Sequence, residues 1–304
     1  MKKTLAPSVT HSDPKGRKFM TIVGNAYDKA GLNNDEGQQV NEATGLADLI
    51  AGFINEHRTR EEFRKEEVKS NYGYLSGYVK PTDLNAQCNQ LRMLFPGGLG
   101  FPNQDLLTRI EKGGVKLPQY AEGWFAVPNW QKNPKIFGST YSEAVQKVLD
   151  TINKALDGKF YNYRNGQIDE QHLRQSANAV EFWKKISLQQ EGAEILIIPA
   201  QFGIRHRGRS VRRARVIMED SNGEVGLGSF AGGNMLLTHP NRLQHYDDLW
   251  IDLVGDEFND PVSVRRFSRA PYFNFHDDEV KFDTRLVSRA NDNYGSASGF
   301  VPQK

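Results

Sequence analysis

The spacing of apolar side chains changes near residue 191 of this 304-residue chain. Before that point, apolar residues recur every three or four positions, which is the period of an amphipathic helix. The clearest example follows Thr140 and Glu143, which fit a capping box, and it ends at Gly158. A second example extends from about Asp169 to Gln190. The pattern therefore predicts a mainly helical first part.

The segments nearer the N-terminus are less regular. The stretch FMTIVG, residues 19–24, predicts a short strand or apolar anchor, and residues 40–54 predict a helix whose apolar stripe faces the core. The mixed charges of residues 56–69 are typical of a solvated continuation of that helix. Two further helices are expected, one with Thr82 and one with Asn103 as its N-cap.

After residue 191 the pattern favours strands. The run EILIIPAQF is short, apolar and β-branched, and Pro199 within it indicates an edge position or a bulge. Asn222 and Gly223 give a hairpin signal between VIMED and EVGLGSF, and YFNF and VKFDT predict another hairpin. We therefore predict the fold class α+β, with a mainly helical N-terminal part and a β-rich, mostly antiparallel C-terminal part.

The predicted organisation is a flexible basic tail over residues 1–18, a mainly helical part over residues 19–191 and a β-rich part over residues 192–304. The two larger parts could also share one core. Hydrophobic residues make up 38% of the chain and charged residues 25%, which is the balance of a globular protein. The chain is therefore expected to fold.

The single cysteine, Cys88, excludes an internal disulfide framework and favours a small buried thiol in a reducing compartment. The first residues, MKKTLAPSVTHSDPKGRKF, lack the apolar region of a secretory signal, and no apolar stretch is long enough to span a bilayer. We therefore expect a cytoplasmic location without a membrane anchor. No cofactor motif is present, and no cofactor is predicted.

Positive charge is concentrated in RHRGRSVRRAR, although the net charge of the whole chain is only +2. We call this stretch the arginine run, and it comprises Arg205, His206, Arg207, Arg209, Arg212, Arg213 and Arg215. Guanidinium groups bind phosphate in a bidentate manner, so the run is a candidate surface for nucleic acid or for a phosphorylated or acidic ligand. The acidic segment 247–260 is an alternative partner within the chain. The sequence leaves these three readings open.

The local structure of the arginine run is also open. Arg205, Arg207 and Arg209 would share one face if the preceding strand continued. Alternatively, the hydroxyl of Ser210 caps a helix that begins SVRRAR, and the helix N-terminus would then form an anion site. His206 is a weaker candidate for a general base, because the surrounding cations lower its pKa.

A second group of candidate residues lies in and before the stretch HYDDLWIDLVGDEF. Asp252 and Asp256 would lie on one face of a strand, and His239 and His245 are close to them in sequence. Carboxylate and imidazole groups can hold a divalent metal, although none of the established metal-binding spacings is present. These four residues form a low-ranking alternative metal site.

Several phrases resemble those of one protein family. FGIRHRGRSVRRAR, MLLTHPNRLQHYDDLWID, GDEF and YGSASGFVPQ occur here in this order. Together they resemble a family of uncharacterised bacterial proteins, over roughly residues 123–303. The resemblance implies a bacterial, intracellular setting, and it implies no activity, fold or catalytic residue.

Three functional hypotheses follow. The leading one is a nucleic-acid-associated binding protein whose arginine run contacts phosphates without reading sequence. The second is an enzyme that processes phosphoesters or nucleotides, with the arginines on phosphate and the Asp and His residues on a metal. The third is a structural or assembly protein in which the arginines and acidic residues form a salt-bridge network. Whether the protein is an enzyme stays open at this point.

Overall fold

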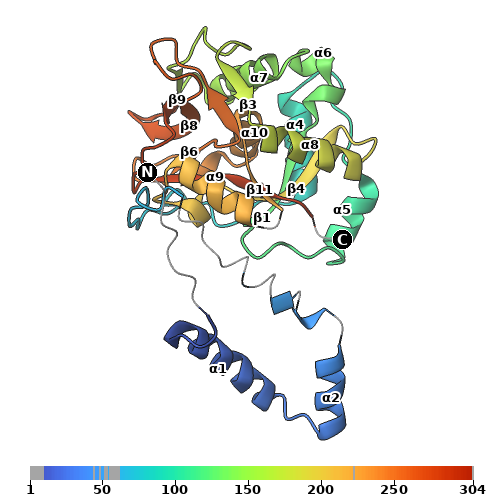
Figure 1. Cartoon of the computed structure of the whole chain (residues 1–304). Helices are drawn as coiled ribbons and strands as arrows, with labels where there is room; N and C mark the ends of the chain where they lie inside the picture. The colour runs from blue at the N-terminus through green and yellow to red at the C-terminus, as the bar shows by residue number, and fades with distance from the viewer. Residues whose placement is uncertain are drawn as a thin grey trace. The chain divides into compact units, whose positions relative to one another are not determined.

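The computed structural model describes residues 10–43, 45–47, 49–50, 54, 62–221 and 223–302. The chain divides into two compact units, residues 1–58 and residues 59–304 (Figure 1). Across the described residues, no helix is both long enough and apolar enough to cross a membrane.

The first unit contains α1 (Pro14–Lys29) and α2 (Asn34–Glu42). FMTIVG lies in the middle of α1, so the predicted strand is wrong; its apolar residues continue at helical spacing to Tyr27. The predicted core stripe of residues 40–54 is also wrong where it is described. The helix α2 ends at Glu42, and Val40 and Leu46 are 37% and 42% exposed.

The second unit contains most of the regular structure. Its α-helices are α4 (Leu84–Leu94), α5 (Gln104–Glu111), α6 (Pro134–Phe137), α7 (Tyr141–Ala155), α8 (Ala177–Gln189), α9 (Val211–Asp220) and α10 (Ser229–Thr238). Short 3-10 helices are η1 (Trp130–Lys132), η2 (Ile204–His206) and η3 (Pro240–Arg242). The strands are β1 (Gly123–Pro128), β2 (Phe160–Asn162), β3 (Leu173–Gln175), β4 (Ile195–Gln201), β5 (Glu224–Gly226), β6 (Trp250–Asp252), β7 (Asp256–Phe258), β8 (Arg269–His276), β9 (Glu279–Leu286), β10 (Tyr294–Ser296) and β11 (Ser298–Phe300).

Several predicted helix starts are confirmed. Thr140 and Glu143 form the capping box of α7, and the side chain of Asn103 caps α5. The cap of α4 is Asp83, one residue after the predicted Thr82. The helix α8 begins only after Ser176, because the chain before it forms the strand β3.

The first sheet has the strand order β1-β4-β11-β5 and is antiparallel throughout. The strand β1 precedes residue 191 and β4 follows it, so the parts predicted on either side of that residue share this sheet. Pro199 does not lie at an edge of the sheet, because β4 pairs with β1 on one side and β11 on the other. It is tolerated there because β11 meets β4 only at Ala200 and Gln201.

The second sheet has the order β10-β6-β8-β7-β3, and β9 joins β8 to β2. The predicted hairpin of YFNF and VKFDT is confirmed as β8 and β9. Most pairs are antiparallel, with parallel pairing between β10 and β6 and between β2 and β9. With helices mostly in the N-terminal part and antiparallel-rich sheets in the C-terminal part, the predicted α+β fold class is confirmed.

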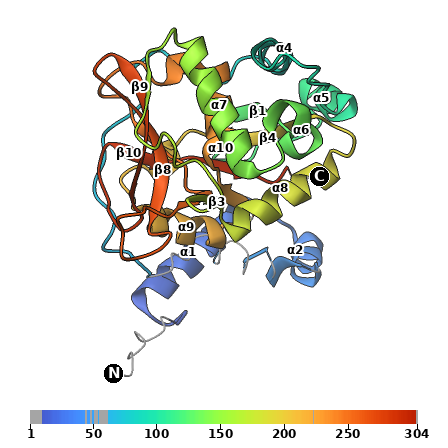
Figure 2. The same ribbon diagram turned by 90° about the horizontal axis from the view of Figure 1, so that it is seen from above.

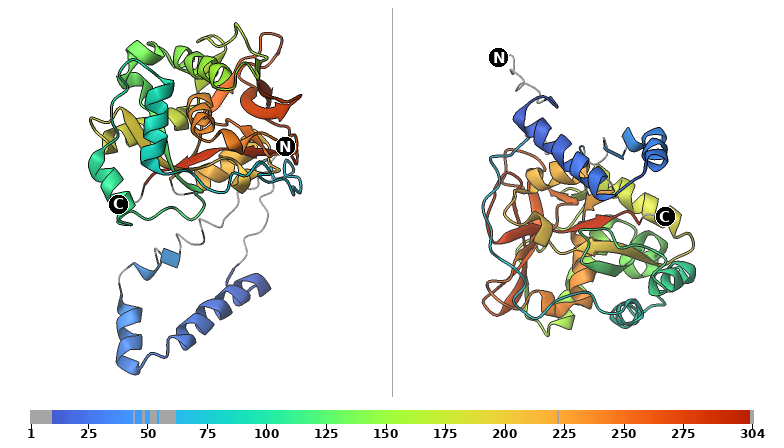
Figure 3. Two further views of the ribbon diagram at one scale, coloured as in Figure 1. Left: turned by 180° about the vertical axis from the view of Figure 1, so that it is seen from behind. Right: turned by 90° about the horizontal axis from the view of Figure 1, so that it is seen from below.

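The helix α10 lies at the centre of the second unit, and every one of its residues is buried. Figure 2 shows α7 and α10 between the β8–β9 hairpin on one side and α4, α5 and α6 on the other. In both views of Figure 3, α4 and α5 (teal) lie at the side opposite that hairpin (red). A Cβ on Gly232 or Gly233 would come within 2.3 Å of Leu253 or 2.5 Å of Val148, so glycine lets α10 pack closely against both neighbours.

The two sheets are joined by one short segment near the C-terminus. Tyr294–Ser296 forms β10 in the second sheet, and Ser298–Phe300 forms β11 in the first. Ala297 is the single residue between them, and it is completely buried. A continuous extended segment therefore belongs to both sheets.

Gly203 provides a test of this packing. Its φ angle is +134°, and a Cβ would lie 2.6 Å from the carbonyl oxygen of Gly295 in β10. We expect Gly203→Ala to lower the free energy of unfolding by about 2–4 kcal/mol, because both backbone strain and a clash oppose it. Gly73→Ala is the control, since nothing lies within 4 Å of a Cβ there. Equal stability of the two variants in urea denaturation would contradict the expectation.

Candidate functional site

The arginine run does not continue the strand β4. Its first residues form η2, Gly208 has a φ angle of +76°, and the helix α9 begins at Val211. The side chain of Ser210 accepts a hydrogen bond from the backbone N–H of Arg213, so the alternative in which Ser210 caps a helix is confirmed. The predicted strand VIMED is wrong, because these residues are the last turns of α9; Asn222 of the proposed hairpin lies outside the described residues.

Two glutamates before α4 bind the arginines of α9. Glu66 accepts hydrogen bonds from Nε of Arg212 at 2.8 Å and 3.0 Å, and Glu67 pairs with Arg213 and Arg209. The hydrogen bonds from Arg212 lower the pKa of Glu66 below its usual value. The predicted helix of residues 56–69 is therefore wrong for residues 62–69, although all of these except Glu66 are exposed as expected, and residues 55–61 lie outside the described residues.

Glu66 also occupies the N-terminus of α9. Its carboxylate accepts a 2.7 Å hydrogen bond from the hydroxyl of Ser210, and its backbone oxygen accepts one from the N–H of Ser210. Backbone pairing between Glu67 and Arg209 fixes the segment beside the arginine run. A carboxylate of the chain itself thus lies beside this helix N-terminus, while the N–H of Arg212 donates to the backbone oxygen of Val287.

A third carboxylate, Glu224 of β5, binds the beginning of the arginine run. Arg205 lies 3.0 Å from it and stacks 3.3 Å over the ring of Tyr120. His206 is completely buried, and its Nε2 lies 2.8 Å from Glu224 while its Nδ1 faces a guanidinium nitrogen of Arg209 at 3.2 Å. Burial lowers the pKa of His206, which fits a neutral ring that donates from Nε2 and accepts at Nδ1.

The remaining arginines differ from one another. Arg215 donates to the backbone oxygens of Val254 and Asp256 at 2.9 Å and 2.8 Å, so it does reach the acidic segment 247–260. Arg207 is exposed and donates to the backbone oxygen of Tyr72 at 2.7 Å. We call the five arginines other than Arg207, together with Glu66, Glu67 and Glu224, the arginine clamp. All three of its carboxylates lie outside the predicted acidic segment.

The Asp and His residues of the alternative metal site are not brought together. Asp252 pairs with Arg285 at 3.2 Å, whereas Asp256 lies on a different strand and accepts from Tyr141 at 2.7 Å and from the N–H of Ser229 at 2.6 Å. Burial raises the pKa of each of these carboxyls to about 6. Within the described ranges, no group of three or more His, Cys, Asp or Glu residues could hold a metal ion.

The two histidines of that group also have separate environments. His239 is buried, and the N–H of Thr82 donates to its Nε2 at 3.0 Å while its Nδ1 lies 3.0 Å from the backbone oxygen of Met235. Both ring nitrogens are therefore used inside the fold. His245 is exposed, and its Nδ1 accepts from the N–H of Asp247 at 3.0 Å.

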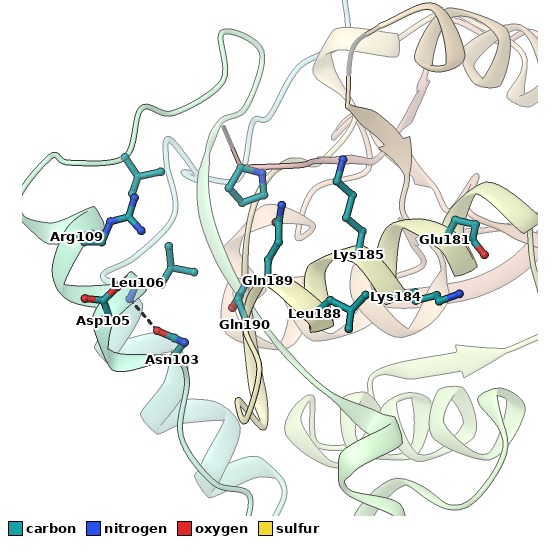
Figure 4. A pocket seen from close by; sticks show the side chains of 12 residues that line it. Asn103, Asp105, Leu106, Arg109, Glu181, Lys184, Lys185, Leu188, Gln189 and Gln190 are labelled. Carbon is teal, nitrogen blue, oxygen red and sulfur yellow. Dashed lines mark hydrogen bonds between the residues drawn. The ribbon is translucent and has the colours of Figure 1, made fainter. Parts of the chain in front are cut away.

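A cavity of about 590 Å³ lies between α5 and α8 (Figure 4). Arg109 of α5 and Lys184 and Lys185 of α8 line it. Among the residues that the structure describes, no carboxylate forms an ion pair with any of these three cations. Sequence reasoning missed this cavity, because each cation resembles an ordinary solvated residue of a helix surface.

Comparison with models of known protein families, with curated proteins and with solved structures finds no match to this chain. The geometry of the second unit is therefore the basis for a functional interpretation.

His239 gives the second unit a defined dependence on pH. Burial lowers its pKa to about 4, from an ordinary value of 6.5, so protonation favours the unfolded state. The stabilisation is complete above pH 6.5 and is lost as the pH falls towards 4, by about 3 kcal/mol in total. We expect His239→Gln to remove this part of the pH dependence in urea unfolding measured between pH 4 and pH 7.

The exposed His245 supplies the control for this experiment. His245→Gln makes the same substitution at an exposed position outside the core and should leave the pH dependence as in the unaltered chain. Parallel curves for His239→Gln and the unaltered chain would show that the titration of His239 is not coupled to folding.

Proposed function

We propose that this chain is a structural or assembly protein and that its arginine run is an internal network. The observation that supports this proposal is the arginine clamp, in which four of the six arginines bind carboxylates and Arg215 donates to two carbonyl oxygens. The exposed Arg207 donates to a single carbonyl oxygen. Paired guanidinium groups have few donors left for phosphate oxygens. Nucleic-acid association through this run is therefore the alternative that the experiment below must separate.

The clamp holds an irregular segment against the core. Residues 62–69 contain no helix, and the described hydrogen bonds fix them to α9 through Glu66 and Glu67. Arg213 is only 2% exposed and also donates to the backbone oxygen of Glu62 at 2.9 Å. A buried guanidinium without these acceptors is costly, so the network specifies a single position for the segment.

Removal of Arg213 tests this role. We expect Arg213→Gln to lower the free energy of unfolding by about 3 kcal/mol, because glutamine cannot replace the donors that the buried guanidinium gives to Glu67 and to the backbone oxygen of Glu62. Arg212→Gln should cost less, about 1 kcal/mol, since this pair is more exposed to water. Arg207→Gln is the matched control and should unfold like the unaltered chain in urea.

The same variants serve in a binding experiment. Equilibrium binding to single- and double-stranded DNA and RNA is measured across a salt series, and no salt-dependent binding that depends on the arginine run is expected. Tight binding with a steep salt dependence, flattened by Arg207→Gln without loss of stability, would overturn the proposal in favour of nucleic-acid association.

The first unit supports the assembly part of the proposal. The helix α1 has no buried residue, and Phe19, Ile22, Val23 and Tyr27 share one face at helical spacing. It carries four basic residues and one acidic residue, whereas α2 carries three acidic residues and no basic one. Opposite charges on the two helices suit pairing of α1 with α2 of a second copy, which would cover the apolar face.

We therefore expect the chain to associate with a second copy of itself. Val23→Asp, in the centre of the apolar face, should shift the molar mass measured by size-exclusion chromatography with light scattering towards the monomer. Thr21→Asp adds the same charge on the opposite face of α1 and should leave the oligomer intact. A monomer for the unaltered chain at all concentrations would contradict pairing of two copies.

A further inference from the structure

We infer that the cavity between α5 and α8 binds a small organic anion that has an apolar body. The inference is independent of the arginine clamp and uses none of its residues. It starts from the three cations that line the cavity, Arg109, Lys184 and Lys185. They come from two helices that are far apart in the sequence, and their charges are not neutralised by ion pairs within the part of the chain that the structure describes.

The positions of the side chains fit a bound acid group. In Figure 4, Arg109 extends from α5 towards the gap, while Lys185 and Gln189 extend side by side from α8. A guanidinium group, an ammonium group and an amide thus offer donors from opposite walls. Asn103, in contrast, uses its side-chain oxygen to cap α5, at 2.9 Å from the N–H of Leu106.

The apolar side chains of the lining indicate that the ligand has an apolar body. Leu106 and Val115 lie on the side of α5, and Leu188 and Pro302 complete the wall. A volume of about 590 Å³ is within the range of cavities that hold small organic molecules. Burial of an aromatic or aliphatic body against these side chains would add affinity that a bare inorganic ion cannot obtain.

The net charge of the cavity lining indicates how many acid groups the ligand carries. Asp105 and Glu181 also line the cavity, so its lining contains three cationic and two anionic side chains with a net charge of +1. This net charge matches a ligand with one negative charge, whereas a polyanion such as nucleic acid would be repelled by both carboxylates. The expected class is therefore an organic monoanion, such as a carboxylate or sulfonate on an apolar body.

The test uses 1-anilinonaphthalene-8-sulfonate, an apolar aromatic monoanion, with the full chain. Fluorescence titration should show a saturable site, and Arg109→Gln and Lys185→Gln should each weaken binding by about tenfold. Lys154→Gln, on the exposed side of α7, is the matched control and should bind like the unaltered chain. Circular dichroism of each variant verifies that the fold is retained.

The uncharged analogue N-phenyl-1-naphthylamine separates charge from apolar burial. We expect it to bind more weakly than the sulfonate and to be insensitive to Arg109→Gln and Lys185→Gln. The inference is overturned if the sulfonate binds these two variants as tightly as the control, since the probe then lies elsewhere. It is also overturned if the two substitutions weaken the binding of both probes equally, because the cations would then not recognise the acid group.

Discussion

The arrangement of the second unit depends on the pairing of α9 with two glutamates that precede the first helix of that unit. Arg213 is buried in the fold, and a guanidinium cannot be taken from water unless acceptors replace its hydration. Glu67 and the backbone of Glu62 supply those acceptors. Residues 62–69 must therefore lie along α9 whenever α9 is in place, although they have no helical or apolar pattern of their own.

Other buried polar groups in this unit also have hydrogen-bond partners within the chain. Asp248 is completely buried and accepts backbone N–H bonds from Leu75 at 2.7 Å and from His245 at 2.8 Å, so it joins two loops. Asp256 accepts a hydrogen bond from the backbone N–H of Ser229 and so fixes the start of α10. Much of the acidic segment that follows His245 is thus used to satisfy backbone donors. The cavity between α5 and α8 differs, because its cations face a space large enough for a ligand.

Features with local causes were predictable from the sequence. The capping box of α7, the cap of α5 and the β8–β9 hairpin each depend on residues a few positions apart. The strand assignment of VIMED failed because β-branched residues occupy the last turns of α9, where burial outweighs their preference for strands. Likewise, FMTIVG was too short for its helical and strand periods to be distinguished.

The candidate site was less accessible to sequence reasoning than the fold class. The arginine run was visible, but 146 residues separate Arg212 from its partner Glu66, and no pattern along the chain connects them. The nearer acidic segment contributes chiefly backbone acceptors to Arg215. The cavity gave no signal either, because Arg109 and Lys185 belong to different helices and come together only through tertiary packing.

The segment from Tyr294 to Phe300 has a consequence for how the molecule folds. It contributes β10 to one sheet and β11 to the other, with only the buried Ala297 between them. If this segment unfolds, each of the two sheets loses a strand. We therefore do not expect the two sheets to unfold one after the other as separate subdomains. Instead, we expect both sheets to be lost in the same unfolding transition, although the unit is built around two of them.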